Sequence, residues 1–343
     1  MFGGGGGELK PMGIGVAILL TVFGLFWWAI VGLLDVHLAF GFYRQARATR
    51  YATTTGVVTQ STVRVSGSNR SRRYTPELRY TYEVGGREFT GTHYRFDFVG
   101  GRDEVHALVA AHAVGARVAV YFDPANPAES LLLPGLDGGD LFIAVFLVPF
   151  NLAGLAIAWI LGSGVREMVA PSATGGCRLW EDGLQVRVRM PIVPPLACGL
   201  AAGGGAAFLA IFVVGIARGA QPSVAMMGVV WGAILAVALA AYVARWRRAA
   251  RGEFDLVLDP IGRTMTLPRM LGRNEEVGVR YRDIRAIEVN RVLPPPGTKR
   301  YSEYYPTLVL AGPDGQPCRE RIGKWQDSSS AQRFAAWLRL RIT

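Results

Sequence analysis

Four long stretches of the sequence contain no Asp, Glu, Lys or Arg, although these residues make up 18% of the chain. The stretches cover residues 12–34, 141–161, 191–217 and 224–244. Each reaches the ~20 residues that an α-helix, which rises about 1.5 Å per residue, needs to cross roughly 30 Å of hydrocarbon. The absence of charge therefore predicts four transmembrane helices and argues against an ordinary soluble fold.

The first stretch lacks the features of a cleaved secretory signal. Its apolar run is longer than the about 7 to 15 residues of a signal h-region, and no convincing A-x-A cleavage site follows it. We therefore interpret it as an uncleaved membrane anchor that follows a flexible, glycine-rich leader at residues 1–11.

The sequence offers little from which to build a catalytic or metal site. Its three cysteines contain no C-x-x-C pair, and no G-x-S-x-G elbow is present. His106 and His112 are six residues apart, which puts them on different faces of a helix, so they do not form a helical metal pair. We predict no catalytic residue, no metal ligand and no cofactor, and hence a protein that is not an enzyme.

Transport is also disfavoured, because ionisable side chains within membrane spans usually mark a transport pathway and these spans have none. Asn151, two positions after Pro149, is the one strongly polar residue of note, and an interhelical hydrogen bond is favoured for it over a functional kink. A channel or a lipid-handling transporter remains the alternative, because glycine-rich helices could move against one another.

Residues 35–140, between the first two spans, read as a small, mainly β domain. Polar and apolar residues alternate over residues 78–84, and Gly85-Gly86 predicts a tight hairpin turn into residues 87–90. Residues 56–65 and 117–122 are further expected strands. Between them, Val105, Leu108, Val109 and His112 recur at helical spacing and predict a short amphipathic helix over the sheet. Residues 123–127 (DPANP) are expected to form a rigid exit turn.

This loop resembles a known bacterial family. The resemblance is carried by Gly56-Val57-Val58, by the strand and turn YTYEVGG at residues 80–86 with Phe89-Thr90-Gly91 after it, and by VAVYFDPANP at residues 118–127. These segments resemble the bacterial domain of unknown function 3592 (DUF3592). The resemblance implies a β-domain between two membrane helices, with no established activity and no assigned catalytic residues.

The second loop, residues 162–190, ends in a second hairpin signal. Residues 181–183 (EDG) form the expected turn, and residues 184–190 alternate strictly before running into the third span. A lone hairpin is marginal in water, so we expect it to pair with a sheet on the same side of the membrane.

The tail, residues 245–343, would supply that sheet. It contains six expected short strands and a closing amphipathic helix that starts near Ser328 and presents Phe334, Trp337, Leu338 and Ile342 on one face. The expected strands cover residues 254–258, 264–267, 277–281, 284–289, 308–310 and 317–322. This order of elements resembles a bacterial pleckstrin-homology-like (PH-like) domain.

Orientation follows from the cations near the ends of the spans, because short loops rich in Lys and Arg stay cytoplasmic. The count is nine against four in favour of both termini in the cytoplasm, with residues 35–140 outside. The nine are Lys10, Arg166, Arg178, Arg187, Arg189, Arg245, Arg247, Arg248 and Arg251. The four that oppose this orientation are Arg44, Arg47, Arg50 and Arg218.

Two groups of residues are candidates for binding or packing. The cluster at the exit of the fourth span could bind anionic lipid or act only as a topology anchor, which is the favoured reading; it consists of Arg245, Trp246, Arg247, Arg248 and Arg251. Small residues in the third and fourth spans would let these helices pack closely, with homodimerisation through the same faces as the alternative; they are Gly199, Gly203, Gly228 and Gly232.

Together these features predict a non-enzymatic protein of the bacterial inner membrane that acts as a scaffold, a partner-binding module or an envelope sensor. Its expected partners are membrane lipids and a protein of unknown identity, with homo-oligomerisation left open. Nucleic acid is not expected, although the tail carries 19 basic against 11 acidic residues.

Overall fold

A computed structural model describes residues 14–67, 72–96, 101–170, 172–218, 222–293, 302–312 and 316–343. The predicted leader at 1–11, the proline-rich loop that opens at 294 and the turn at 314–315 lie outside these residues. The chain divides into two compact units: residues 29–148 with 208–231, and residues 1–28, 149–207 and 232–343. Each unit is described by itself.

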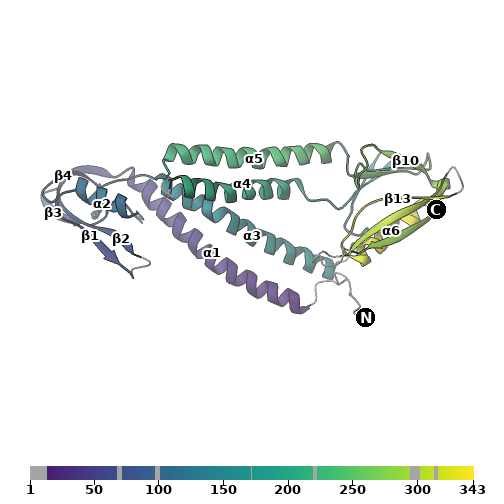
Figure 1. Ribbon diagram of the computed structural model, residues 1–343, viewed down its shortest axis with the longest axis horizontal. Helices are drawn as coiled ribbons and strands as arrows, with labels where there is room; N and C mark the ends of the chain where they lie inside the picture. The colour runs from purple at the N-terminus through teal and green to yellow at the C-terminus, as the bar shows by residue number, and fades with distance from the viewer. Residues whose placement is uncertain are drawn as a thin grey trace. The chain divides into compact units, whose positions relative to one another are not determined.

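Four helices are long and apolar enough to cross a membrane, as predicted. They are α1 (Ile14–Ala48), α3 (Gly138–Val169), α4 (Pro195–Arg218) and α5 (Val224–Ala250) (Figure 1). The expected end of the first helix at residue 34 is wrong, because α1 continues to Ala48. Helix propagation is cooperative, and the next residues contain no proline that would end it.

The first β domain is a five-stranded antiparallel sheet in the order β3-β2-β1-β4-β5. A short helix, α2 (Arg102–Ala111), packs against β1 and β2 and buries Val105 and Leu108, which confirms the predicted amphipathic helix. The strands are β1 (Ala52–Ser66), β2 (Arg73–Val84), β3 (Arg87–Gly91), β4 (Arg117–Asp123) and β5 (Asn126–Leu131).

The predicted hairpin at Gly85-Gly86 is confirmed, with both glycines in the left-handed region at φ 60° and 77°. The exit turn expected at residues 123–127 is only partly right. Asp123 pairs with Asn126, so the chain turns back and forms β5 instead of leaving the sheet. Pro127 lies within this last strand, where a missing amide is tolerated at an edge.

The two edge strands of this sheet come together. His93 and Leu131 form a parallel bridge, and the Leu133 amide donates to the Tyr94 carbonyl at 2.8 Å. Tyr80 is fully buried in the core of the domain, and its hydroxyl donates to the His93 carbonyl at 3.0 Å. Its ring lies so close to Gly91 that a Cβ there would overlap it, which explains the glycine at the end of β3.

The second β domain contains two antiparallel sheets and a closing helix. The five-stranded sheet has the order β10-β9-β8-β7-β6, and the three-stranded sheet has the order β11-β12-β13. The strands are β6 (Arg178–Asp182), β7 (Gln185–Arg189), β8 (Asp255–Asp259), β9 (Thr264–Leu267), β10 (Val277–Arg280), β11 (Ile284–Val292), β12 (Glu303–Ala311) and β13 (Pro317–Arg321). All six strands expected in the tail are therefore confirmed.

One hydrophobic core unites both sheets with helix α6 (Ser328–Ile342). Val188, Leu256, Leu308, Phe334 and Leu338 are fully buried in it. Helix α6 begins at Ser328, as predicted, and Asp327 is its N-cap: the Asp327 carboxylate accepts hydrogen bonds from the backbone amides of Ser329 and Ser330. These hydrogen bonds hold the pKa of Asp327 below its usual value, against the effect of burial.

The order of the elements differs from the prediction of a purely C-terminal β domain. Strand β7, which precedes α4, pairs with β8, which follows α5, through the register Arg187 to Val257 and Val188 to Leu256. The expectation that the hairpin of the second loop would pair with the tail is thus confirmed. A pair of membrane-length helices is inserted between two neighbouring strands of one sheet.

The segment that follows α3 also packs onto this domain. The Trp325 indole donates to the Gly175 carbonyl at 2.8 Å, and Arg333 Nε donates to the Ser172 carbonyl at 2.9 Å. Gly175 has a φ of 60°, and a Cβ there would overlap the backbone oxygen of Ser330 in α6.

Substitution Gly175→Ala should therefore destabilise the second β domain by about 3 kcal/mol, the sum of left-handed strain and overpacking. Thermal unfolding in detergent, followed by tryptophan fluorescence, measures the loss. Gly278→Ala is the matched control in the same domain, since a Cβ there meets nothing within 4 Å. Equal stability of the two variants would contradict the described packing of residues 172–177.

Candidate functional site

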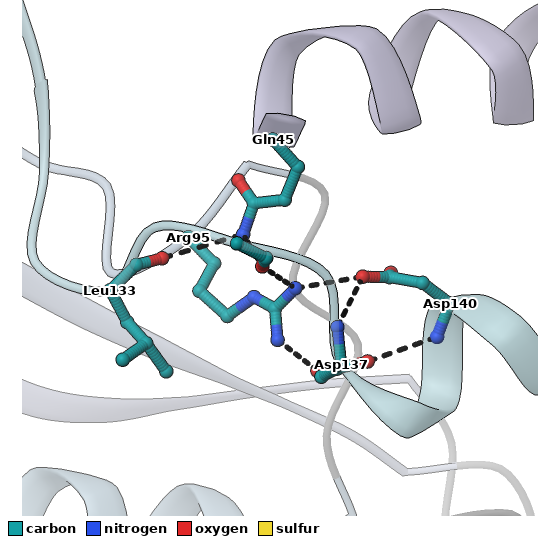
Figure 2. Close-up of polar contacts among 6 residues, drawn as sticks. Gln45, Arg95, Leu133, Asp137 and Asp140 are labelled. Atoms are coloured by element: carbon teal, nitrogen blue, oxygen red, sulfur yellow. Dashed lines mark hydrogen bonds and ion pairs between the residues drawn. The ribbon is translucent and has the colours of Figure 1, made fainter. Parts of the chain in front are cut away.

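The first candidate site surrounds a buried arginine, Arg95, which lies near the end of α1 and the start of α3. Arg95 is only 5% exposed, and its guanidinium forms ion pairs with Asp137 and, at 2.7 Å, with Asp140. It also donates to the Gly135 carbonyl at 2.9 Å (Figure 2). The same carbonyl accepts a hydrogen bond from Gln45 Nε2 at 2.9 Å. We call these four side chains, Gln45, Arg95, Asp137 and Asp140, the Arg95 junction.

The two aspartates also begin helix α3. The amide of Asp140 donates to Asp137 Oδ1 at 2.9 Å, and the amide of Asp137 donates to Asp140 Oδ2 at 3.0 Å. This reciprocal cap satisfies amides that lack a partner within the helix, and its negative charge suits a helix N-terminus. Between them, Gly138 touches the backbone of Pro222, just before α5, so closely that no side chain would fit.

The end of α1 is fastened to the same domain by several further contacts. Arg44 stacks over the Phe96 ring at 3.8 Å, and Arg47 pairs with the buried Asp123. Just beyond α1, the Tyr51 hydroxyl donates to Glu129 at 2.6 Å. Burial, with this carboxylate, raises the pKa of Tyr51 above its usual value. Gln45 is 2% exposed, and its Oε1 accepts no hydrogen bond among the described residues.

The second candidate site lies where the inserted helices meet the sheet. Arg189, at the end of β7, forms a two-bonded ion pair with Asp255 of β8, at 2.8 and 3.2 Å. Its Nη2 also donates to the Ala249 carbonyl in the last turn of α5 at 2.7 Å. One guanidinium therefore links the strand before α4, the last turn of α5 and the strand after α5. We call this set, Arg189, Ala249 and Asp255, the Arg189 junction.

The basic cluster predicted at the exit of α5 lies beside this junction. Arg245 Nε donates to the Val193 carbonyl at 3.2 Å, and Arg248 pairs with Glu253 at 2.8 Å. Both guanidiniums lie over the Phe254 ring, at 4.2 and 5.2 Å. The distance from Arg251 Nη1 to Glu253 Oε1 is longer, at 3.9 Å, and the Arg251 side chain is largely exposed.

The four glycines predicted to pack helices fall into two groups. A Cβ at Gly199 or Gly203 of α4 would lie 3.0 Å from the Ala238 residue of α5, so these two positions face the neighbouring helix. A Cβ at Gly228 or Gly232 of α5 would meet nothing within 4 Å. The prediction that all four form one contact between α4 and α5 is therefore wrong for Gly228 and Gly232, because the face of α5 that meets α4 carries Ala238 and Tyr242 instead.

Histidine and cysteine side chains are the remaining candidates for a reactive or metal-binding group. Among the described residues, no group of three or more His, Cys, Asp or Glu side chains could hold a metal ion. The rings of His93, His106 and His112 lie against Phe96, Tyr74 and Tyr94. Burial raises the pKa of the Cys177 thiol to about 12, which keeps it protonated and unreactive near neutral pH.

Comparison with known families supports the predicted resemblance. Residues 54–137 match the family described as domain of unknown function (DUF3592). This part of the chain is a DUF3592 domain. The match covers the sheet from β1 to β5 and ends at Asp137 of the Arg95 junction. No curated protein and no solved structure matched the chain.

The sequence pattern predicted neither junction, and it marked Arg189 only as one of the cations used to infer orientation. The spacing Asp137-Gly-Gly-Asp140 before an apolar run is a helix-start signal that could have been read. Arg95, Arg189 and Asp255 carry no such signal, because their partners are distant in the sequence and meet only after the sheets form.

Substitution Arg95→Ala should destabilise the DUF3592 domain by about 2 to 4 kcal/mol, because it leaves the Asp137 and Asp140 carboxylates close together without a cation. The expected loss of unfolding free energy is set below the usual range for buried ion pairs, because the Asp137 side chain is nearly half exposed. Chemical or thermal unfolding in detergent measures the change. The control Arg64→Ala removes an exposed pair with Glu77 and should cost less than about 1 kcal/mol. Equal losses would show that the Arg95 junction contributes no more than a surface ion pair.

Proposed function

We propose that the protein is a non-enzymatic envelope sensor of the bacterial inner membrane, in which the DUF3592 domain lies outside and the second β domain lies in the cytoplasm. The observation that carries the proposal is the insertion of α4 and α5 between neighbouring strands β7 and β8. Helices joined this directly to a sheet have no flexible linker to absorb a movement. A change in their spacing would act on the β7–β8 ladder and on the Arg189 junction.

The Arg95 junction supports the same role from the DUF3592 domain. One arginine of that domain is bonded to the start of α3 and shares a carbonyl with Gln45 of α1. A partner that displaces the segment around Arg95 would therefore disturb two membrane helices at once. Such a network suits a scaffold, or a sensor whose helices shift when a protein partner binds. It provides no reactive group for catalysis.

The proposed orientation gains support from the arginines that opposed it. Arg47 is neutralised by Asp123, and Arg44 stacks on Phe96, so two of the three cations that follow the first uncharged stretch have partners within the DUF3592 domain. Long translocated segments also weaken the effect of such charges on topology. We therefore keep the proposed orientation, with both termini in the cytoplasm.

The second β domain is proposed to be PH-like. Two antiparallel sheets that share one core and a closing C-terminal helix suit that assignment. In this chain the domain would be split, since β6 and β7 precede the inserted helices and the remaining strands follow them. A cytoplasmic partner could bind a split domain of this kind, and its binding would depend on the positions of α4 and α5.

Thiol labelling tests the orientation. Cys318 is exposed on β13, whereas Cys177 is buried and Cys198 lies within α4. In intact spheroplasts, a membrane-impermeant maleimide should label Arg87→Cys, on the β2–β3 hairpin, and should label Cys318 only after permeabilisation. Labelling of both positions from the same side would refute the two-sided arrangement.

Hydrogen exchange tests the coupling. Substitution Arg95→Lys keeps the charge but loses the forked hydrogen bonds, and we expect faster amide exchange in β7, β8 and the end of α5 as well as near residue 95. The comparison variant Arg64→Lys, in the same domain, should leave β7 and β8 unchanged. Exchange that changes only within the DUF3592 domain would contradict the sensor proposal.

A further inference from the structure

Two arginines at the end of α5 are held on one aromatic ring. Arg245 and Arg248 both lie over Phe254, whose side chain is buried. Arg245 is further fixed by its Nε bond to the Val193 carbonyl. A topology anchor needs only positive charge near the membrane and does not need guanidiniums in fixed positions. The fixed geometry therefore calls for a different explanation.

The charge of this cluster is not balanced by the protein. Glu253 is the one acidic side chain that pairs with it among the described residues, and it is shared between Arg248 at 2.8 Å and Arg251 at 3.9 Å. Neither Nη atom of Arg245 has a hydrogen-bond partner in the described part of the chain, and Arg247 forms no ion pair there. Asp255, the nearby carboxylate, is occupied by Arg189. Four arginines thus face one carboxylate.

The position of these arginines at the end of α5 indicates which class of anion would bind them. Arg245 and Arg247 lie in the last two turns of a helix of membrane-spanning length, Val224–Ala250. Trp246 between them is 52% exposed, and tryptophan favours the level of the lipid headgroups. Guanidiniums with free Nη groups bind phosphate oxygens through paired hydrogen bonds.

We propose that Arg245, Arg247 and Arg248, supported by Phe254 and flanked by Trp246, form a binding site for the headgroup of an anionic phospholipid. The lipid phosphate accepts hydrogen bonds from the free Nη groups of Arg245 and Arg248, and Arg247 adds attraction from the same helix turn. The bound lipid balances the charge next to the Arg189 junction, and it relieves the repulsion between two cations on one ring.

Native mass spectrometry of the intact chain tests this site, with phosphatidylglycerol and phosphatidylethanolamine as the two probes. We expect phosphatidylglycerol to be retained preferentially, and its affinity to fall about fivefold in Arg247→Gln and in Arg245→Gln. Arg285→Gln, an exposed arginine of β11 with no partner among the described residues, is the control and should bind as the wild type does. Should Arg245→Gln fail to fold, Arg247→Gln decides the question, because Arg247 is exposed and forms no hydrogen bond or ion pair with the residues that the structure describes.

Equal retention of the two lipids would overturn the proposal, as would equal losses in all three variants, which would indicate attraction to the overall charge of the domain. An excess of inorganic phosphate or glycerol phosphate is the final arm. Displacement of phosphatidylglycerol by these small anions would assign the site to a soluble phosphate and would refute a lipid site. Retention of the lipid under that excess supports it.

Discussion

The backbone hydrogen bonds between β7 and β8 are the constraint on which the second half of the molecule depends. A two-stranded hairpin such as β6–β7 has too little buried surface to be stable in water by itself. Its pairing with β8 places Val188 in a core together with Leu256 and Phe334. Because β7 leads into α4 and α5 leads into β8, that same ladder fixes where two membrane-length helices leave the sheet.

The ladder also explains the position of Arg189. Antiparallel strands bring Arg189 opposite Asp255, and the strand that follows α5 brings the last turn of that helix within reach. Asp255 is nearly fully buried, so an uncompensated charge there would be costly, and the two-bonded pair offsets the cost. The Arg95 junction solves a similar problem at the first turn of a helix, where Arg95 pairs with Asp137 and Asp140 and donates to the Gly135 carbonyl.

Local patterns in the sequence predicted the elements well, and long-range contacts much less well. Alternating residues identified strand β2, and the pair Gly85-Gly86 identified its hairpin, because turn geometry is encoded by adjacent residues. Strand β5 was missed because Pro127 argued against a ladder, although an edge strand accepts proline. The end of α1 was missed because Asp35 ends the uncharged stretch, whereas a single charged residue does not end a helix.

The candidate sites could be predicted only in part for the same reason. The basic cluster at the end of α5 is visible in the sequence as a run of arginines, but the ring of Phe254 beneath two of them is a consequence of the fold. The small-residue pattern identified four glycines, whereas only Gly199 and Gly203 face a neighbouring helix. A pattern on one helix does not say which face its neighbour takes.

Disulfide trapping in native membranes tests the split sheet most directly. With the natural cysteines replaced, the pair Arg187→Cys and Val257→Cys should form an intramolecular disulfide, since these residues face each other across β7 and β8. The pair Arg187→Cys and Asp259→Cys, two residues out of register, should not. Absence of the first disulfide, or its formation only between different chains, would contradict a sheet assembled around the inserted helices.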